Sequence, residues 1–166
     1  MSPPTPGKKA PAIALPATDG KKVKLTDFVG QSVVVYFYPR DNTPGCTTES
    51  AEFAAAHAKF KRANTVILGI SQDSLVSHAK FVKKLDLPFV LLSDEDGKVC
   101  SKYDVLKLKK MYGKEFTGIE RSTFLIDNKG VLVAEWRKVK VAGHVDEVLA
   151  AAKSLNKASK KNPKNS

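Results

Sequence analysis

The sequence predicts an α/β protein with a central mixed β-sheet flanked by helices on both faces. Two runs of β-branched and aromatic residues, 33–38 and 65–70, are typical of strands buried on both faces. A helical pattern follows each run, so strands and helices alternate. Near the end of the chain, two more strand-like runs flank a tight turn and precede a last helix. This order of elements favours one mixed sheet over a helical bundle or an all-β fold.

Each element has a local signal. Segments 10–15 and 21–25 suggest a small hairpin-like opening around Gly20. The strand at 33–38 stops at Pro39, because a proline cannot donate a hydrogen bond to a sheet. The later elements, in order, are a helix to about Arg62 with Phe53, Ala56 and Phe60 facing inward, a strand at 65–70, a helix capped by Ser74, a strand at 89–92, a turn at 93–97 with a short helix after it, strands at 121–127 and 131–136 joined by a turn at 128–130, and a helix from 144 to 156.

The size and charge of the chain limit its function. Its 166 residues suit a single domain, which we expect to span residues 1–156, with a disordered basic tail at 157–166. The net charge of +11 leaves open a basic nucleic-acid or chaperone-like binding module as the alternative function. However, the tail lysines contribute part of that charge, and no zinc spacing or RNA-recognition aromatic motif is present. We therefore expect no specific nucleic-acid partner.

Two further features concern the compartment. No apolar run approaches the roughly 18 residues of a membrane-spanning helix, and the proline- and lysine-containing N-terminus does not match a signal peptide. We therefore expect a cytoplasmic protein with no membrane partner. The two cysteines, Cys46 and Cys100, are too few for a disulfide scaffold. In a reducing compartment, each is either catalytic or simply buried.

Cys46 stands at a predicted helix start. Thr43 and Pro44 have the residue types of an N-cap and a first helical position, which places Cys46 at the third helical position. There it meets the positive end of the helix dipole and backbone N–H groups without intrahelical partners. Both effects favour the thiolate over the thiol, so we expect Cys46 to be a nucleophile. A buried structural cysteine would not require Thr-Pro-Gly before it at a helix start.

The same residues carry a family resemblance. Pro39, Thr43 and Cys46 match the Pro-x-x-x-Thr-x-x-Cys signature of peroxiredoxins. The string YPRDNTPGCTTE resembles the peroxiredoxin Q, or bacterioferritin comigratory protein, subfamily. Further similar blocks are SDEDGKV (93–99), MYGK (111–114) and IERSTFLID (119–127). The resemblance extends from about residue 10 to about residue 155, and the blocks occur in the same order.

The resemblance implies a thioredoxin-like fold and a thiol-dependent peroxidase with an antioxidant role. Such an enzyme reduces hydrogen peroxide and organic hydroperoxides to water or alcohols, and its Cys46 thiolate becomes a sulfenic acid. Thioredoxin or another small thiol would then restore the thiolate. The subfamily also suggests a monomer. No nicotinamide, flavin, haem or metal motif appears, so we expect neither a cofactor nor a metal.

The peroxide needs hydrogen-bond donors and a cation. Thr43 can offer its hydroxyl, and the N–H groups of Gly45 and Cys46 are available at the helix start. By resemblance, Arg121 is the cation, and Pro39 and Pro44 shield the sulfur from bulk water. From the residues alone, Arg121 could equally be a surface residue. Glu49 could pair with Arg40 or Arg121 as a supporting residue, or it could be an ordinary exposed glutamate on a helix.

Two other enzyme classes also use cysteine. A thioredoxin-type disulfide oxidoreductase needs Cys-x-x-Cys, and Glu49 occupies its second cysteine position. A cysteine hydrolase needs a histidine base beside the thiol. His57, His78 and His144 therefore remain open as bases, although none lies in an acyl-transfer motif. On its apolar helix face, His78 fits a hydrogen-bonded histidine at the core edge better than a ligand.

The recycling step is the open question. Many subfamily members carry a resolving cysteine, but the corresponding positions here are Ala51 and, in our alignment, Val82. Cys100 shares an apolar face with its helix neighbours, which favours a structural role. We therefore expect a one-cysteine cycle with an external thiol. A cycle in which Cys100 resolves Cys46 through a disulfide is the alternative, and it would require local opening of an element.

Overall fold

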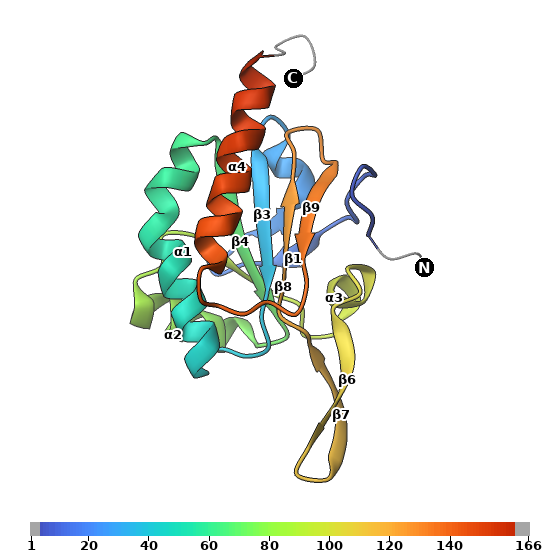
Figure 1. The fold of residues 1–166 in the computed structure, drawn as a ribbon. Coiled ribbons are helices and arrows are strands. Elements are labelled where there is room, and N and C mark those ends of the chain that lie inside the picture. The colour runs from blue at the N-terminus through green and yellow to red at the C-terminus, as the bar shows by residue number, and fades with distance from the viewer. Residues whose placement is uncertain (1–3, 162–166) are drawn as a thin grey trace.

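The central feature of the computed structural model, which describes residues 4–161, is a five-stranded mixed sheet (Figure 1). The strand order is β5-β4-β3-β8-β9. Strands β3 and β4 are parallel, as are β4 and β5, whereas β8 is antiparallel to both β3 and β9. Their bounds are Ser32–Phe37 for β3, Thr65–Ser71 for β4, Leu91–Ser93 for β5, Ser122–Ile126 for β8 and Leu132–Trp136 for β9. The predicted mixed sheet is therefore confirmed.

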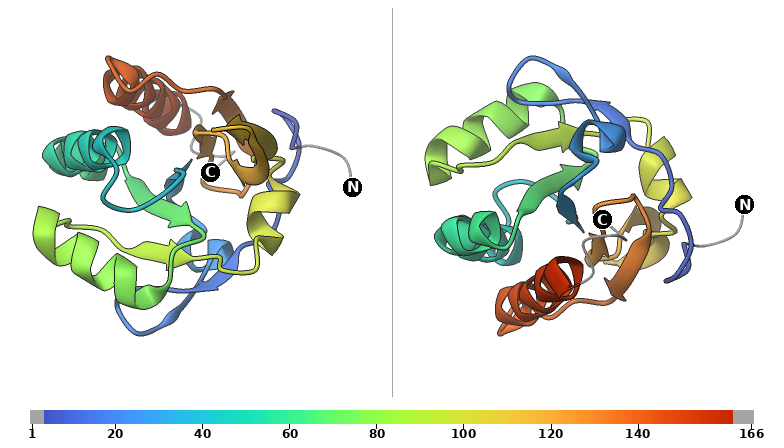
Figure 2. Two further views of the ribbon diagram at one scale, coloured as in Figure 1. Left: turned by 90° about the horizontal axis from the view of Figure 1, so that it is seen from below. Right: turned by 90° about the horizontal axis from the view of Figure 1, so that it is seen from above.

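Helices cover both faces of this sheet (Figure 2). On one face lie α1 (Pro44–Arg62), α2 (Leu75–Leu85) and α4 (His144–Lys161). The opposite face is covered by α3 (Lys98–Lys102) and by the hairpin of β1 (Ala14–Pro16) and β2 (Lys22–Lys24), which the 3₁₀ turn η1 (Leu25–Phe28) follows. Every residue of β3 is buried, because alternate side chains enter one core and then the other. Burial on both faces of the sheet thus explains the continuous apolar run at 33–38, as the sequence predicted.

One pair of strands was not predicted. Strands β6 (Leu106–Met111) and β7 (Lys114–Ile119) form a separate antiparallel hairpin that extends away from the main sheet (Figure 1). Its turn at Tyr112 and Gly113 has positive φ angles of 54° and 77°. Lysines interrupt its apolar positions, and Leu108 and Phe116 are exposed. The base of the hairpin packs against the core through Ile119 and Leu106, whereas its exposed outer part leaves no continuous apolar run to recognise.

Several predicted boundaries moved. The third strand begins at Leu91 rather than residue 89. Helix α4 continues to Lys161, so the prediction that the disordered tail begins at residue 157 is wrong for 157–161. The side chain of Asn128 donates a hydrogen bond to Ser159 Oγ across 3.4 Å, which links this last part of the helix to the β8–β9 turn. Residues 162–166 lie outside the described part of the chain. Within the described residues, no helix is long and apolar enough to cross a membrane.

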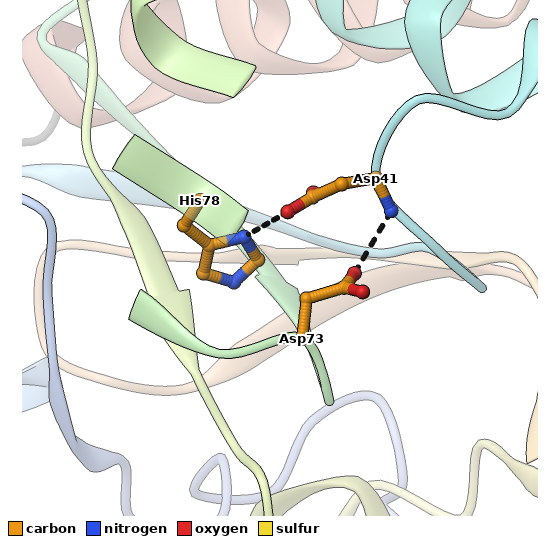
Figure 3. A group of neighbouring side chains, drawn as sticks. All are labelled: Asp41, Asp73 and His78. Carbon is orange, nitrogen blue, oxygen red and sulfur yellow. Dashed lines mark hydrogen bonds and ion pairs between the residues drawn. The ribbon is translucent and has the colours of Figure 1, made fainter. Parts of the chain in front are cut away.

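A buried hydrogen-bond network fixes the loop between β3 and α1. Asp41, in that loop, accepts hydrogen bonds from Tyr38 Oη at 2.6 Å and Ser77 Oγ at 2.8 Å. Its carboxylate also lies 2.8 Å from His78 Nδ1, and its backbone N–H donates to Asp73 Oδ2 at 2.8 Å (Figure 3). The loop is therefore held to the ends of β4 and α2 by both its side chain and its main chain.

The network also defines the state of His78. Its Nε2 lies 3.0 Å from the Leu92 carbonyl oxygen, which can only accept. Burial tends to raise the pKa of Asp41, but hydrogen bonds from His78 and Tyr38 lower it overall, so Nδ1 faces a carboxylate. Both ring nitrogens therefore donate, and His78 and Asp41 form a buried ion pair. His78 is thus the hydrogen-bonded core histidine that the sequence predicted.

We expect Asp41→Asn to destabilise the protein by about 3–5 kcal/mol, because it leaves a buried cation without its anion. Urea denaturation at neutral pH measures this change. Asp96→Asn is the matched control, since Asp96 forms an exposed pair with Lys98 at 3.9 Å, and its loss should cost about 0.5 kcal/mol or less. An Asp41→Asn protein as stable as the wild type would show that His78 is neutral.

Candidate active site

Cys46 lies in the first turn of α1, as predicted. Thr43 is the N-cap residue, and the helix begins at Pro44. Cys46 is therefore the third helical residue, and its side chain is fully buried in the core on the α1 side of the sheet. The positive end of the helix dipole and the unpaired N–H groups of this first turn favour negative charge on the sulfur.

The Thr43 hydroxyl is oriented differently from our expectation. It donates a hydrogen bond to the Arg40 carbonyl oxygen at 2.8 Å and makes no capping bond to the helix. Its hydrogen is therefore already used, and Oγ1 is left as an acceptor for the O–H group of a hydroperoxide. Pro39 and Pro44 are both exposed, so any shielding they give the sulfur acts from the surface.

Arg121 contacts both Cys46 and Glu49. It directly precedes β8, and its guanidinium donates to Cys46 Sγ from Nη2 at 3.3 Å and to Glu49 Oε1 from Nη1 at 2.7 Å. Burial acts to lower the pKa of Arg121, but the charges of Glu49 and Cys46 outweigh it and raise the pKa. The residue thus remains a cation next to the sulfur.

Gly45 permits this close approach. A Cβ atom at position 45 would lie 3.0 Å from Arg121 Nη2. That separation is tighter than a normal carbon–nitrogen contact, so any other residue would push the guanidinium away. The glycine therefore has a packing function in addition to its place at the helix start.

Glu49 faces the interior, one turn after Cys46. Its side chain has no exposed surface, so the interpretation as an exposed helix glutamate is wrong. It pairs with Arg121 rather than Arg40, and Oε2 has no hydrogen-bond partner among the described residues. Burial raises the pKa of Glu49 to about 7, even though Arg121 acts to lower it.

The histidines do not form a base for Cys46. Among the described residues, Arg121 supplies the hydrogen bond to Cys46 Sγ, and no histidine takes part in one. His144 Nε2 lies 2.7 Å from Thr123 Oγ1, and burial together with Arg121 lowers its pKa to about 4. His57 contacts Phe89, and burial lowers its pKa. The geometry therefore does not support the cysteine hydrolase.

Cys100 lies on the other side of the sheet. It is fully buried in the core beneath α3, whereas Cys46 belongs to the core beneath α1. Burial and the hydrogen bond and charge of Asp94 raise the pKa of the Cys100 thiol. The central sheet therefore separates the two sulfurs, and Cys100 lacks the electropositive surroundings of Cys46.

Asp41, Asp73 and His78 are the group within the described residues whose ligand atoms are close enough to hold a metal ion (Figure 3). Their atoms are already used. Both His78 nitrogens donate, and Asp73 Oδ2 accepts from Asp41 N and Ser71 Oγ. The group stabilises the loop before α1.

Comparison with known proteins agrees with this geometry. The model of the AhpC/TSA family matches residues 6–135. The peroxiredoxin Bcp of Bacillus subtilis is 51% identical over 150 residues, which cover 90% of this chain and 96% of that relative. The peroxiredoxin Bcp of Escherichia coli is 42% identical over 149 residues, with the same coverage of 90% and 96%.

Solved structures extend the similarity to the fold. Peroxiredoxin Q from Xanthomonas campestris has a TM-score of 0.83 and 49% identity, covering 87% of this chain and 91% of its own. The PrxQ of Xylella fastidiosa, as a mutant, has a TM-score of 0.87 and 40% identity, covering 93% and 98%. These similarities confirm the expected thioredoxin-like fold. The chain therefore belongs to the AhpC/TSA family, as a peroxiredoxin of the peroxiredoxin Q or bacterioferritin comigratory protein type.

Proposed function

We propose that Cys46 is the thiolate with which this thiol peroxidase attacks peroxides, and that Arg121 stabilises both the thiolate and the leaving oxygen. The observation that carries the proposal is the 3.3 Å contact between Arg121 Nη2 and Cys46 Sγ at the start of α1. A fixed cation in a largely water-excluded site stabilises developing charge more strongly than it would in water.

The reaction follows from this arrangement. The sulfur attacks the terminal peroxide oxygen, a sulfur–oxygen bond forms, and the oxygen–oxygen bond breaks. Negative charge develops on the leaving oxygen, next to the Arg121 guanidinium and the N–H groups of the first helical turn. Thr43 Oγ1 accepts a hydrogen bond from the O–H group of the attacked oxygen and so orients the peroxide. The leaving oxygen takes the electron pair of the broken bond and a proton, so the products are Cys46 sulfenic acid and water or an alcohol.

Alkyl hydroperoxides and hydrogen peroxide are the proposed substrates. The bacterioferritin comigratory protein of Xanthomonas campestris, 48% identical with a TM-score of 0.83, has trapped intermediate and ligand complex structures that address its alkyl peroxide reduction activity. It covers 87% of this chain and 92% of its own. That similarity supports the same substrate class here.

The proposed recycling uses one cysteine of this chain. The position of Cys100 in the opposite core supports a structural role, so an external thiol, thioredoxin or a similar reductant, attacks the sulfenic acid.

The two free cysteines agree with a cytoplasmic location. The net charge of +11 disfavours self-association, so we propose a monomer. The basic binding module is not favoured, since Lys107 and Lys110 of the exposed hairpin already pair with Asp104 and Glu115.

Cys46→Ser should abolish peroxide reduction and leave the fold intact, because serine has a similar size but forms no comparable anion at neutral pH. Peroxide consumption with a thiol reductant measures the activity, and circular dichroism checks the fold. Thiol-dependent turnover that persists in a folded Cys46→Ser protein would move the reaction to another residue.

Arg121→Met should slow the reaction with peroxide by about 10²–10³-fold, the usual loss for one preorganised charge-stabilising donor. Stopped-flow measurement of Cys46 oxidation gives the rate constant, and thiolate absorbance reports the sulfur. Arg62→Met is the control, because Arg62 is exposed at the other end of α1 and should be neutral. Equal rates in both variants would exclude Arg121 from the peroxide step.

Cys100→Ala should retain turnover with an external thiol, with Cys46 sulfenic acid as the intermediate. Intact mass and non-reducing peptide mapping after stoichiometric hydrogen peroxide identify the product. If the wild type instead forms a Cys46–Cys100 disulfide and the variant stalls as sulfenic acid, Cys100 is the resolving cysteine.

A further inference from the structure

The buried Glu49 carboxylate shares its neighbouring cation, Arg121, with the Cys46 sulfur. Arg121 is the cation that it contacts, and the same guanidinium also contacts Cys46. With both Cys46 and Glu49 ionised, one positive charge would face two negative charges in a site where the Glu49 side chain has no exposed surface. A buried anion without full compensation is expensive.

Among the described residues around Glu49, no group supplies a second cation. On α1, the charge of Glu52 acts on Glu49 in the same unfavourable sense. On β3, the Tyr36 hydroxyl is hydrogen-bonded to Ser50, and burial raises the pKa of Tyr36, so this hydroxyl stays neutral. On α4, His144 is near Arg121 but has a pKa lowered to about 4, and it is neutral at physiological pH. The most favourable way to balance the site is therefore a proton.

Glu49 can hold that proton. Its Oε1 accepts from Arg121, while its Oε2 is buried without a hydrogen-bond partner among the described residues. An ionised oxygen in that position would lack any donor, whereas a protonated Oε2 carries no charge to compensate. Burial raises the pKa of Glu49 to about 7, so the carboxyl group titrates in the neutral range.

We infer that Glu49 is protonated while Cys46 is a thiolate, and that it releases this proton when Cys46 is oxidised. The inference rests on the proposed role of Cys46. Oxidation turns the anionic sulfur into a neutral sulfenic acid, so Arg121 loses one of its two partners. Its charge then acts fully on Glu49, which ionises. The guanidinium thus faces one anion before and after the reaction.

The step balances without a proton from solvent. The sulfur gives two electrons, its bond to the terminal oxygen forms, and the oxygen–oxygen bond breaks. The leaving oxygen takes the electron pair of the broken bond and one proton, and Glu49 releases one proton as Arg121 acts on it, so no net proton comes from solvent. Thiolate, protonated Glu49 and hydroperoxide thereby become sulfenic acid, ionised Glu49 and alcohol, or water when the substrate is hydrogen peroxide. Glu49 acts through Arg121, so it is a charge-balancing residue rather than a group that binds the peroxide.

The test is the number of protons taken up when Cys46 is oxidised. Reduced protein is mixed with one equivalent of hydrogen peroxide in weak buffer with a pH indicator, while thiolate absorbance and peroxide loss are followed together. At about pH 6, below the Glu49 titration, the wild type should take up almost no proton per sulfur. At about pH 8 Glu49 is already ionised, so uptake should approach one proton.

Glu49→Gln removes the titrating group and keeps a side chain of similar shape. It should take up about one proton per sulfur at both pH values, since solvent then supplies the proton. Glu115→Gln is the charge-matched control, because Glu115 is exposed on β7 and pairs with Lys110, so it should reproduce the wild type. If Glu49→Gln does not fold, the wild-type pH series alone decides.

Uptake of one proton by the wild type at both pH values, with the thiolate observed, would overturn the inference. So would equal pH dependence in the wild type and Glu49→Gln, or an absent thiolate at about pH 6, since the shared proton would then be on the sulfur. Failure of the proposed function looks different: peroxide would disappear without loss of the Cys46 thiol, or would not disappear at all.

Discussion

The contacts of the Arg121 guanidinium with Cys46 and Glu49 are the interaction on which the rest of the site depends. Arg121 stands at the start of β8 and reaches α1, where it donates to Cys46 and to Glu49 from different nitrogens. A planar group with donors in a fixed fork can hold two partners in a defined geometry, which the point charge of a lysine cannot. The sulfur therefore depends on contacts between segments 75 residues apart in the sequence, and the central sheet keeps these segments in register. Strand β3 leads into α1 and also pairs directly with β8.

The loop before α1 has a second support that is independent of Arg121. Asp41 links the end of β3 to α2 through His78 and to the end of β4 through Asp73. The carbonyl oxygen of Arg40, next to Asp41, sets the orientation of the Thr43 hydroxyl. A buried ion pair contributes little net stability compared with apolar packing, but it has strict geometric requirements. Here the hydrogen bonds of Asp41 to His78 and Asp73 fix the position of the loop that precedes Cys46.

The sequence could predict what depends on local signals. Buried strands on either side of α1 showed as continuous apolar runs, and Thr43 and Pro44 defined the helix start that places Cys46. Arg121 was different, because no local pattern separates it from the other basic residues, and only the family resemblance identified it. The burial of Glu49 was likewise not apparent, since it arises from a partner far along the chain. The β6–β7 hairpin was missed because most of β7 is exposed and lysines interrupt the apolar positions of β6.

Gly45 shows that the active site limits how far helix α1 can be stabilised by substitution. Alanine forms helices better than glycine, so replacing a helical glycine is a common way to stabilise a protein. At this position the new methyl group would occupy the space through which the guanidinium approaches the sulfur. Stability and reactivity therefore make opposite demands on a single residue. A selection for thermal resistance alone would favour a helix start whose added methyl group moves the guanidinium by a few tenths of an ångström away from its place beside the cysteine.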